Sequence, residues 1–448
     1  MGSRSTNNPS IILAHKTQTV GGLHPGPFGL VRHLVNATKT IVNPRRLAVI
    51  CAVEVEQKSL LVSEAMNSLP FNMSEGDKNL AHEIVYGTFR YLPGLNIQLG
   101  ELCKPAKLPP KIRWLLLTSL YQLHFMRTPA YAVIDEANKL AIELKFVGLK
   151  ALVNGVLRNA ERGKEAFEKA LSVQKWLLPT WLAEQLKAQY GDEEVASWLE
   201  SWKERGSLSY WTVDGTGLDG DEASAHLPHA WRRSKPVPID AFEDRRLYVQ
   251  NESSQAIAEL ASRLEPESVL DLCAAPGGKS CYLSAFSKAS RIVANDNASD
   301  RVARLRRNRD RLGMTFEITT EEALTATSGE FDLVLLDAPC TGIGIIGRHP
   351  EIKLLKRHSA DEALLQTQAE LMMAAWKHVR PGGHLLYTVC SLDQREVPAI
   401  PPEAESIMPS TTASLLAPLP FKALGKGFYL TPDNTFDGFS GILLRKQS

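Results

Sequence analysis

The second half of the chain alternates strand-like and helical segments, and this alternation constrains the fold more than any other feature of the sequence. From about residue 240 onward the strand-like segments are SVLDL, RIVAND, FEIT, DLVLLDA and HLLYTVC. Helical segments such as SDRVARLRRNRDRLG and ADEALLQTQAELMMAAWKHV lie between them. Such alternation predicts a doubly wound α/β domain with a mostly parallel sheet, in which a ligand lies at the carboxyl ends of the strands.

Residues 271–280, DLCAAPGGKS, follow the first of these strands and end in the Gly-Lys-Ser triplet of a phosphate-binding P-loop. A P-loop also needs a glycine five residues before Gly278, where this chain has Cys273. The strand FDLVLLD nevertheless has the form of a magnesium-binding partner strand. Asp296 ends the second strand, where an acid accepts hydrogen bonds from the ribose of a nucleoside cofactor. The residues therefore favour S-adenosylmethionine over ATP, and they lack the G-x-G-x-x-G spacing of an NAD site.

Two cysteines follow later strands at the same predicted edge of the sheet: Cys340 in DAPC and Cys390 in TVCS. One cysteine at a strand end is usually a small buried hydrophobic residue, but two beside a cofactor suggest chemistry. Carbon 5 of cytosine becomes nucleophilic only after a thiolate adds to carbon 6 of the ring. A base must then remove the carbon 5 proton so that the thiol can leave. Asp337, close to Cys340, is placed to hydrogen-bond the cytosine and to stabilise such an adduct.

The bulk composition is that of a soluble globular protein large enough for two or three domains. The 448 residues are 44% hydrophobic and 23% charged, and the formal net charge of +1 points to no particular partner. The sequence contains no apolar run of membrane-span length, no signal-peptide pattern, no C-x-x-C pair and no histidine at metal spacing from a cysteine. We therefore expect a cytoplasmic protein with no metal and no disulfide framework.

The chain divides into four predicted regions. Asp and Glu are absent from residues 1–42, which we expect to be a flexible basic leader. Apolar residues at three-, four- or eight-residue steps predict an independent all-helical domain over residues 43–164. Residues 165–240 carry two amphipathic helical segments and then Gly- and Pro-rich stretches, so we expect a connecting subdomain there. Residues 241–448 hold the α/β alternation.

Several motifs together resemble the RNA 5-methylcytosine methyltransferases. The matching stretches in the second half are VQNESSQ, DLCAAPGGKS, DAPCTGIGIIGRHPEIK, PGGHLLYTVCS and DGFSGILLRK. In the first half, GTFRYLPGLN, LYQLHFMRTPAYAVIDEA and LVNGVLRNAER resemble the NusB-like domain of the RsmB (Fmu or Sun) branch. The resemblance implies an all-α, RNA-binding NusB-like domain followed by a Rossmann-like, S-adenosylmethionine-dependent methyltransferase domain. It also implies methyl transfer to carbon 5 of a cytosine in small-subunit ribosomal RNA.

The resemblance assigns roles to individual residues. Cys390 is implied as the nucleophile, Cys340 as the residue that assists product release, and Asp337 as their catalytic neighbour. The implied cofactor contacts are Cys273, Ala274, Ala275, Pro276, Gly277, Gly278, Lys279, Asp296 and Asp337. DNA enzymes with this chemistry use the cysteine of the Pro-Cys motif as nucleophile, so the presence of Cys390 favours RNA as the substrate.

Two stretches depart from the family pattern. Glu321 and Glu322 stand where a Gly-Asp pair is usual, and Glu396-Val397 stands where Glu-Asn is usual. A transfer-RNA methyltransferase and an RNA-binding assembly factor with a decayed site therefore stay open as alternatives. A basic cluster after the Pro-Cys motif is expected to contact RNA phosphates. Its members are Arg348, His349, Lys353, Lys356, Arg357 and His358.

Overall fold

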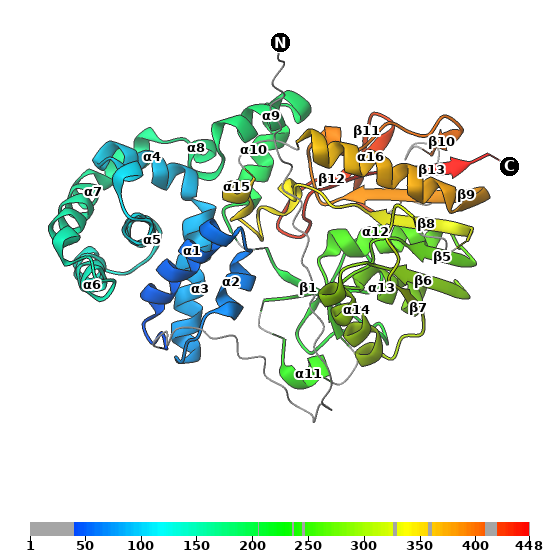
Figure 1. The fold of residues 1–448 in the computed structure, drawn as a ribbon, viewed down its shortest axis with the longest axis horizontal. Coiled ribbons are helices and arrows are strands. Elements are labelled where there is room, and N and C mark those ends of the chain that lie inside the picture. Colours follow the sequence, from blue (N-terminus) through cyan, green and yellow to red (C-terminus); the bar gives the residue numbers. More distant parts are fainter. Residues whose placement is uncertain are drawn as a thin grey trace, which may run out of the picture. The chain divides into compact units, whose positions relative to one another are not determined.

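The computed structural model describes residues 40–204, 206–234, 237–243, 247–325, 329–356, 361–407 and 419–447. Residues 41–448 belong to one compact unit. Most of the predicted basic leader, together with Arg357 and His358 of the basic cluster, lies outside the described residues. Within the described part, helices alone occupy the first region of the chain and an α/β arrangement occupies the last (Figure 1).

The first region consists of α-helices joined by short connections. They are α1 (Pro44–Lys58), α2 (Val62–Ser68), α3 (Glu75–Arg90), α4 (Leu92–Leu102), α5 (Pro110–Phe125), α6 (Ala130–Glu143) and α7 (Lys150–Ala170). α1 begins at Pro44. Proline is tolerated at the first position of a helix because the N–H group there would have no acceptor within the helix. The Asn43 side chain caps this end by accepting hydrogen bonds from the N–H groups of Arg45 and Arg46. Pro93 lies in the first turn of α4, so the periodic leucines between residues 80 and 102 fall on two helices.

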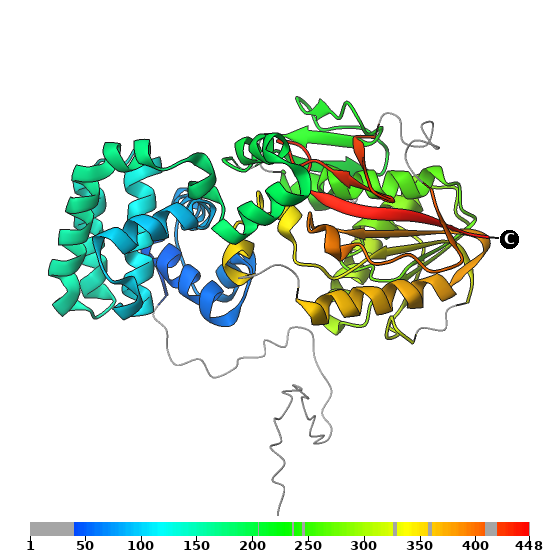
Figure 2. The same cartoon turned by 90° about the horizontal axis from the view of Figure 1, so that it is seen from above.

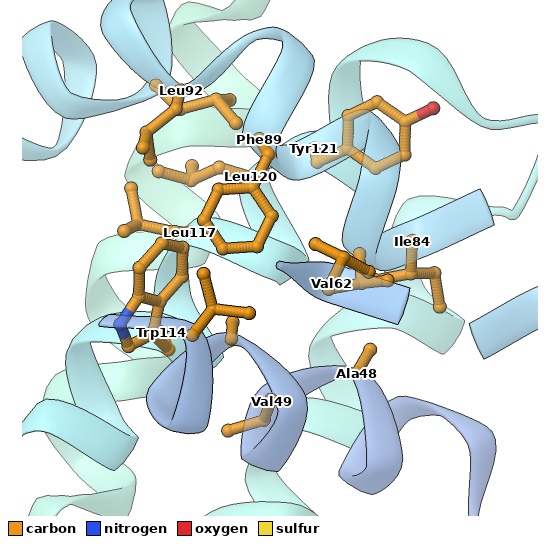
Figure 3. Close-up of a cluster of buried hydrophobic side chains, with 14 of the residues drawn as sticks. Ala48, Val49, Val62, Ile84, Phe89, Leu92, Trp114, Leu117, Leu120 and Tyr121 are labelled. Carbon is orange, nitrogen blue, oxygen red and sulfur yellow. The ribbon is translucent and has the colours of Figure 1, made fainter. Parts of the chain in front are cut away.

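Large apolar side chains fill the space between these helices (Figure 3). Phe89 and Trp114 are fully buried, and their ring centroids lie 5.1 Å apart. The indole Nε1 of Trp114 donates a hydrogen bond of 2.8 Å to Glu56, so its polar atom is satisfied. A core of this kind explains the 3.6-residue periodicity of the sequence, because each helix buries one apolar face.

The same core also contains residues that come from far later in the chain. Ile343, Ile346, Ile352 and Leu392 belong to the cluster of buried side chains formed by the helices. They lie in and after the two cysteine motifs. The helical region therefore shares its core with the segments that carry the cysteines, and the boundary at residue 164 stays a prediction.

The connecting region contains helices and a small sheet. The helices are α8 (Val173–Leu177), α9 (Thr180–Tyr190) and α10 (Asp192–Ser201). Pro179 separates α8 from α9, because a proline cannot donate the backbone hydrogen bond of a helix interior. The strands β1 (Leu208–Thr212), β2 (Glu222–Ala223), β3 (Ala230–Arg233) and β4 (Leu247–Val249) pair antiparallel in the order β2-β3-β1-β4, with the short helix α11 (Ile239–Glu243) before β4. The sequence patterns predict none of these strands, which are too short to display a period of two.

The last region confirms the predicted α/β class with a mixed sheet. Its parallel strands are β5 (Ser268–Asp271), β6 (Arg291–Asn295), β7 (Glu317–Thr319), β8 (Phe331–Asp337) and β9 (Val379–Val389). Each overlaps one of the strand-like segments found in the sequence. The antiparallel strands are β10 (Ala404–Ser406), β11 (Phe421–Leu424), β12 (Gly427–Leu430) and β13 (Phe439–Lys446). The order is β11-β12-β13-β9-β8-β5-β6-β7, with β10 paired to β13.

Helices cover both faces of this sheet (Figures 1 and 2). The covering helices are α12 (Glu252–Arg263), α13 (Gly278–Phe286), α14 (Ser299–Leu312) and α16 (Glu362–Lys377). The short helix α15 (Ile352–Leu355) packs against the helical core instead. Leu333 and Leu335 of β8 pack with α12, α13 and α14, whereas Val334 and Leu336 pack with α16. Two covered faces explain why β8 reads as a continuous apolar run. Among the described residues, none of the helices combines the length and the hydropathy that a membrane span requires.

The shared core gives a test of how strongly the later segment is tied to the helices. Ile346 is 3% exposed, so Ile346→Ala should leave a cavity and destabilise the fold by about 2–5 kcal/mol. Ile97→Ala is the matched control, because Ile97 lies on α4 and is 40% exposed. Its effect should stay within about 0.5 kcal/mol. Urea unfolding followed by circular dichroism measures both changes, and equal midpoints for the two variants would contradict a shared core.

Candidate functional site

The predicted site residues come together at the carboxyl edge of the parallel strands. β5 lies between β6 and β8, and β9 flanks β8 on its other side. Because these strands are parallel, their carboxyl ends meet at one edge. Asp296 follows β6, residues 273–279 follow β5, and the two cysteine motifs follow β8 and β9. All the residues proposed from the sequence therefore border the same region.

The loop after β5 is a compact turn. Ala274 N–H donates to the Asn295 carbonyl at 2.9 Å, and Gly277 N–H donates back to the Ala274 carbonyl at 2.8 Å. The Ala275–Pro276 peptide bond between them is cis. Gly277 has φ +101°, and a Cβ there would lie 2.5 Å from Leu305 of α14. Only glycine allows this turn, after which α13 begins at Gly278.

Asp296 closes this loop from the side of β6. It is 3% exposed. Its Oδ2 accepts a hydrogen bond from Ala275 N–H at 3.3 Å and its Oδ1 accepts one from Ala298 N–H at 3.1 Å. The guanidinium of Arg301 lies 3.0 Å from the same Oδ1. The carboxylate is thus held at the end of the strand with its position set by backbone groups.

Lys279 does not lie in a phosphate cradle. Its Nζ is 2.5 Å from Asp337 Oδ2, at the end of β8, and the residue is buried. Burial alone would lower the pKa of Lys279, but the charge of Asp337 and the hydrogen bond to it raise the pKa above its ordinary value. The lysine therefore stays charged and bound to a carboxylate. This arrangement excludes the role of a P-loop lysine, which reaches toward phosphates.

The charges around the loop fit a cationic cofactor. Three carboxylates, those of Asp271, Asp296 and Asp337, surround the turn; Lys279 pairs with Asp337 and Arg301 pairs with Asp296. An acid at the end of β6 suits ribose hydroxyls, and the N-terminus of α13 suits a carboxylate. S-adenosylmethionine carries ribose hydroxyls, a carboxylate and two positive groups, so the residues present fit it. A triphosphate would place its negative charges beside these carboxylates instead.

Asp271 is a site residue that the sequence patterns did not identify. It ends β5, is 1% exposed and accepts a hydrogen bond from Ser280 Oγ at 2.6 Å through Oδ2. Its other oxygen, Oδ1, is buried with no hydrogen-bond partner among the described residues. Burial raises the pKa of the Asp271 carboxyl to about 6. An acid directly after an apolar strand was the signal that could have found it.

The two cysteines face each other. Cys340 Sγ and Cys390 Sγ lie 3.0 Å apart, and both are free thiols that are half-buried. The contact with Cys390 and burial hold the pKa of the Cys340 thiol well above its usual value, and the charges of Glu396 and Asp337 act in the same direction. Asp337 Oδ1 accepts a hydrogen bond of 3.4 Å from Thr388, which lies two residues before Cys390. Hydrogen bonds therefore connect Lys279 of the loop after β5 to Asp337, and Asp337 to Thr388, close to the pair of thiols.

Cys273 differs from these two thiols. Burial raises its pKa to about 12, so it keeps its proton at neutral pH. It packs as a partly buried apolar residue at the edge of the core that lies against α16. Among the described residues, no group of three or more His, Cys, Asp or Glu side chains could hold a metal ion.

One member of the basic cluster after the Pro-Cys motif is withdrawn from solvent. Lys353 is 9% exposed, and its Nζ donates to the carbonyls of Arg90 and Leu177 at 2.7 and 2.8 Å, so this lysine is not placed to contact phosphates. Arg348 is partly exposed and forms an ion pair with Asp437 at 3.0 Å, and Lys356 is exposed. For the rest of the cluster, contact with phosphates stays a prediction.

His349 contacts a carboxylate instead of the cysteines. Its Nδ1 lies 3.4 Å from Oε1 of Glu351, which is fully buried. The same Oε1 accepts a hydrogen bond of 3.0 Å from the N–H of Val62 at the start of α2. This part of the Pro-Cys segment therefore serves the contact with the helices.

Comparison with known proteins follows the same division of the chain. A family model described as "16S rRNA methyltransferase RsmB/F" matches residues 259–401, and one described as "NusB family" matches residues 42–162. The Ribosomal RNA small subunit methyltransferase B of Cronobacter sakazakii is 32% identical over 377 residues, which cover 79% of this chain and 88% of that protein. The protein of the same name from Shewanella oneidensis is 33% identical over 375 residues, with the same coverage of 79% and 88%.

A solved structure matches nearly the whole chain. The crystal structure of PH0851 superposes with a TM-score of 0.72 at 25% identity and covers 91% of this chain and 100% of that one. The family models give a NusB-like part followed by a methyltransferase part, and the two relatives carry the name of a methyltransferase. These matches confirm the resemblance inferred from the sequence motifs.

The buried Asp271 carboxyl should make the free energy of unfolding depend on pH. Its folded pKa of about 6 lies above the ordinary value of 3.8, so the folded state binds the proton more tightly. The resulting stabilisation is fully present below the unfolded pKa and is lost as the pH rises through about 6. A shift of this size corresponds to on the order of 3 kcal/mol.

Urea unfolding between pH 4 and pH 7 tests this effect. Relative to Asp271→Asn, the unmodified protein should lose stability as the pH rises across that window. Asp310→Asn is the control, because the side chain of Asp310 is 65% exposed and should give a difference that does not change with pH. A constant difference for Asp271→Asn as well would contradict the raised pKa.

Proposed function

Because this chain belongs to the RsmB/F family of 16S rRNA methyltransferases, we propose that it methylates carbon 5 of a cytosine in small-subunit ribosomal RNA through a covalent cysteine adduct. The protein is an S-adenosylmethionine-dependent methyltransferase by family. The observation that carries the cytosine chemistry is the pair of facing thiols of Cys340 and Cys390, 3.0 Å apart, at the edge of the sheet where the cofactor loop lies. A single thiol would suffice for a buried structural role, whereas attack and release on one ring need two groups.

In this proposal Cys390 attacks carbon 6 of the cytosine as a thiolate. A sulfur–carbon bond forms, the ring loses its aromatic character, and carbon 5 gains the electron pair that takes up the methyl group. The assignment of the attack to Cys390 rests on its Thr-x-Cys-Ser setting, which is where the nucleophile of the family lies.

In the release step a base takes the carbon 5 proton, the electron pair of that C–H bond re-forms the double bond between carbons 5 and 6, and the sulfur–carbon bond breaks to leave Cys390 as a thiolate. We assign this assistance to Cys340, which would accept the proton as a thiolate and whose sulfur is in contact with that of Cys390. Asp337 is assigned the contact with the cytosine edge, because its Oδ1 lies near Thr388 and its Oδ2 is held by Lys279. Lys279 therefore acts by holding Asp337 between the cofactor loop and the thiols.

S-adenosylmethionine supplies the methyl group when it is bound. We assign the ribose contact to Asp296, and the contacts with the rest of the cofactor to residues 273–279 and Asp337. The backbone hydrogen bonds on Asp296 support this assignment, because they orient a buried carboxylate without consuming all of its acceptor positions. Residues 43–164 are assigned to RNA binding as a NusB-like domain, residues 165–240 to the connecting subdomain and residues 241–448 to the methyltransferase domain.

The division of labour between the cysteines predicts opposite behaviour of two variants. Cys340→Ala should still attack and methylate the ring but fail to release it, whereas Cys390→Ala should form no adduct. Incubation with ribosomal RNA and cofactor, followed by a denaturing gel, should give a slowly migrating protein–RNA band for Cys340→Ala alone.

The control in that experiment is Cys103→Ala, a thiol at the end of α4, which should behave as the unmodified protein. A band from Cys390→Ala alone would make Cys340 the nucleophile, as in DNA enzymes. No band from either variant, with no methyl transfer by the unmodified protein, would favour an assembly factor with a decayed site. Methylation of transfer RNA but not of ribosomal RNA would support the transfer-RNA alternative.

The ribose assignment predicts weaker cofactor binding by Asp296→Ala. Loss of hydrogen bonds to a charged oxygen costs on the order of 1.5–3 kcal/mol each, or roughly 10- to 100-fold in affinity. Titration calorimetry with S-adenosylmethionine measures this change. Asp300→Ala, an exposed acid on the neighbouring α14, is the matched control and should bind normally. Tight binding of ATP with no binding of S-adenosylmethionine would overturn the cofactor assignment.

A further inference from the structure

A buried carboxylate lies between the two cysteine loops. Glu396 follows β9 in a short 3₁₀ turn, Gln394–Glu396, and is 0% exposed. Its Oε1 accepts hydrogen bonds from the hydroxyls of Thr341, at 2.5 Å, and of Ser391. Its Oε2 accepts from Thr341 N–H at 2.9 Å and from the amide of Gln368 at 3.0 Å. All four donors therefore converge on one side chain.

These donors adjoin the two thiols in the sequence. Thr341 directly follows Cys340, and Ser391 directly follows Cys390. The two hydroxyls also lie 3.0 Å from each other. One carboxylate thus connects the residue after each cysteine, in addition to the direct hydrogen bond of 3.1 Å from Gly344 N–H to the Cys390 carbonyl.

The rest of the protein holds this carboxylate from two further directions. Gln368 of α16 donates to Glu396 and also, at 2.9 Å, to the carbonyl of Pro339, which precedes Cys340. Tyr387 of β9 donates its hydroxyl to the Glu396 carbonyl at 2.7 Å. The helix on one face of the sheet and the strand that leads to Cys390 therefore fix Glu396 itself.

We propose that Glu396 is a positioning residue that holds the Cys340 and Cys390 loops at the spacing in which the two sulfurs face each other. Its consequence for catalysis rests on the proposed function, in which both thiols act on one cytosine. The spacing itself is a property of the folded chain. It can be measured without RNA or cofactor.

Substitutions at Glu396 separate the effect of shape from that of charge. Glu396→Ala leaves four buried donors without an acceptor and opens space between the loops. Glu396→Gln keeps the length of the side chain: its oxygen can accept from the two N–H groups while its amide donates to the two hydroxyl oxygens. Glu396→Asp keeps the charge but is one methylene too short to reach both loops.

The first measurement is the rate at which Cys340 and Cys390 form a disulfide with diamide. Each thiol loses one proton, the two sulfurs together lose two electrons, and the N=N bond of diamide is reduced to a hydrazine. Peptide mass spectrometry follows the cross-linked pair. The unmodified protein and Glu396→Gln should react fast, whereas Glu396→Ala and Glu396→Asp should react on the order of 10- to 100-fold more slowly, because misplacement by about 1 Å has effects of this size.

The second measurement is methyl transfer to ribosomal RNA. Glu396→Ala and Glu396→Asp should lower kcat by on the order of 100-fold while the KM for S-adenosylmethionine stays unchanged. Glu396→Gln should retain most of kcat. Each variant is assayed at a temperature where circular dichroism shows it to be folded, so that general destabilisation does not contribute to this order.

A matched control is available in Glu252, another fully buried carboxylate. It accepts hydrogen bonds from Arg232 at 2.6 Å and from Ser224 at 2.6 Å, on the side of the small sheet. Glu252→Gln should change neither the disulfide rate nor kcat at a temperature where it is folded. If Glu396→Ala does not fold, Gln368→Met removes the donor to Glu396 and to Pro339 while keeping the volume, and should slow the disulfide.

The outcomes distinguish this inference from the proposed function. Equal disulfide rates in the unmodified protein, Glu396→Ala and Gln368→Met would overturn the inference whatever the activity. Slower disulfide formation in these variants, in a protein that methylates no RNA, would support the positioning role and remove the proposed function. Slower disulfide formation together with the loss of kcat would support both.

Discussion

The parallel pairing of β6, β5, β8 and β9 is the constraint on which the site depends. β8 and β9 pair in a register that sets Asp337 opposite Thr388, and from there both chains need only a few residues to reach the thiols. β5 lies between β6 and β8, so the cofactor loop emerges between Asp296 and Asp337. A slip of one residue would turn every side chain of a strand to the other face. The side chains of β8 pack alternately against the two helical layers, and this packing fixes the register of the strand and with it the position of Asp337.

The helical part and the cysteine motifs depend on one another through a shared core. Ile343, Ile346 and Ile352 pack among the helices, while Glu351 accepts a hydrogen bond from the first turn of α2. Lys353 is buried without a carboxylate partner among the described residues and satisfies its donors on two backbone carbonyls. Removing the helices would expose these isoleucines to water and remove the carbonyls of Arg90 and Leu177 that accept from Lys353. The stabilising contacts therefore cross the domain boundaries that the sequence pattern suggests.

The charged partners of residues 271–280 distinguish an S-adenosylmethionine loop from a P-loop. The triplet Gly278-Lys279-Ser280 matches the end of a P-loop motif. In the structure, however, Lys279 donates a hydrogen bond to Asp337 and Ser280 donates one to Asp271. Both partners are carboxylates, so neither the lysine nor the serine is turned toward a phosphate. The missing first glycine at Cys273 is consistent with this, because the turn between Ala274 and Gly277 is too short to wrap phosphates. The partners of Lys279 and Ser280, which lie outside the Gly-Lys-Ser triplet, therefore distinguish this loop from a P-loop.

Sequence periodicity and local loop chemistry determined much of this protein. Segments such as SVLDL and RIVAND are strands, and the thiols, Asp296 and the cofactor loop meet at one edge, because parallel strands share the direction of their carboxyl ends. The small sheet β1–β4 and the antiparallel strands after β9 could not be predicted in this way, because they do not alternate with helices and are stabilised by the cross-strand pairs of the folded sheets. The burial of Lys353 could not be predicted either, because a lysine in a basic run has the local pattern of a solvated surface. The sequence by itself determined which residues border the site. Only the tertiary structure decided that the two sulfurs touch and that Glu396 connects their loops, because these contacts join residues up to 55 positions apart through burial that no local pattern encodes.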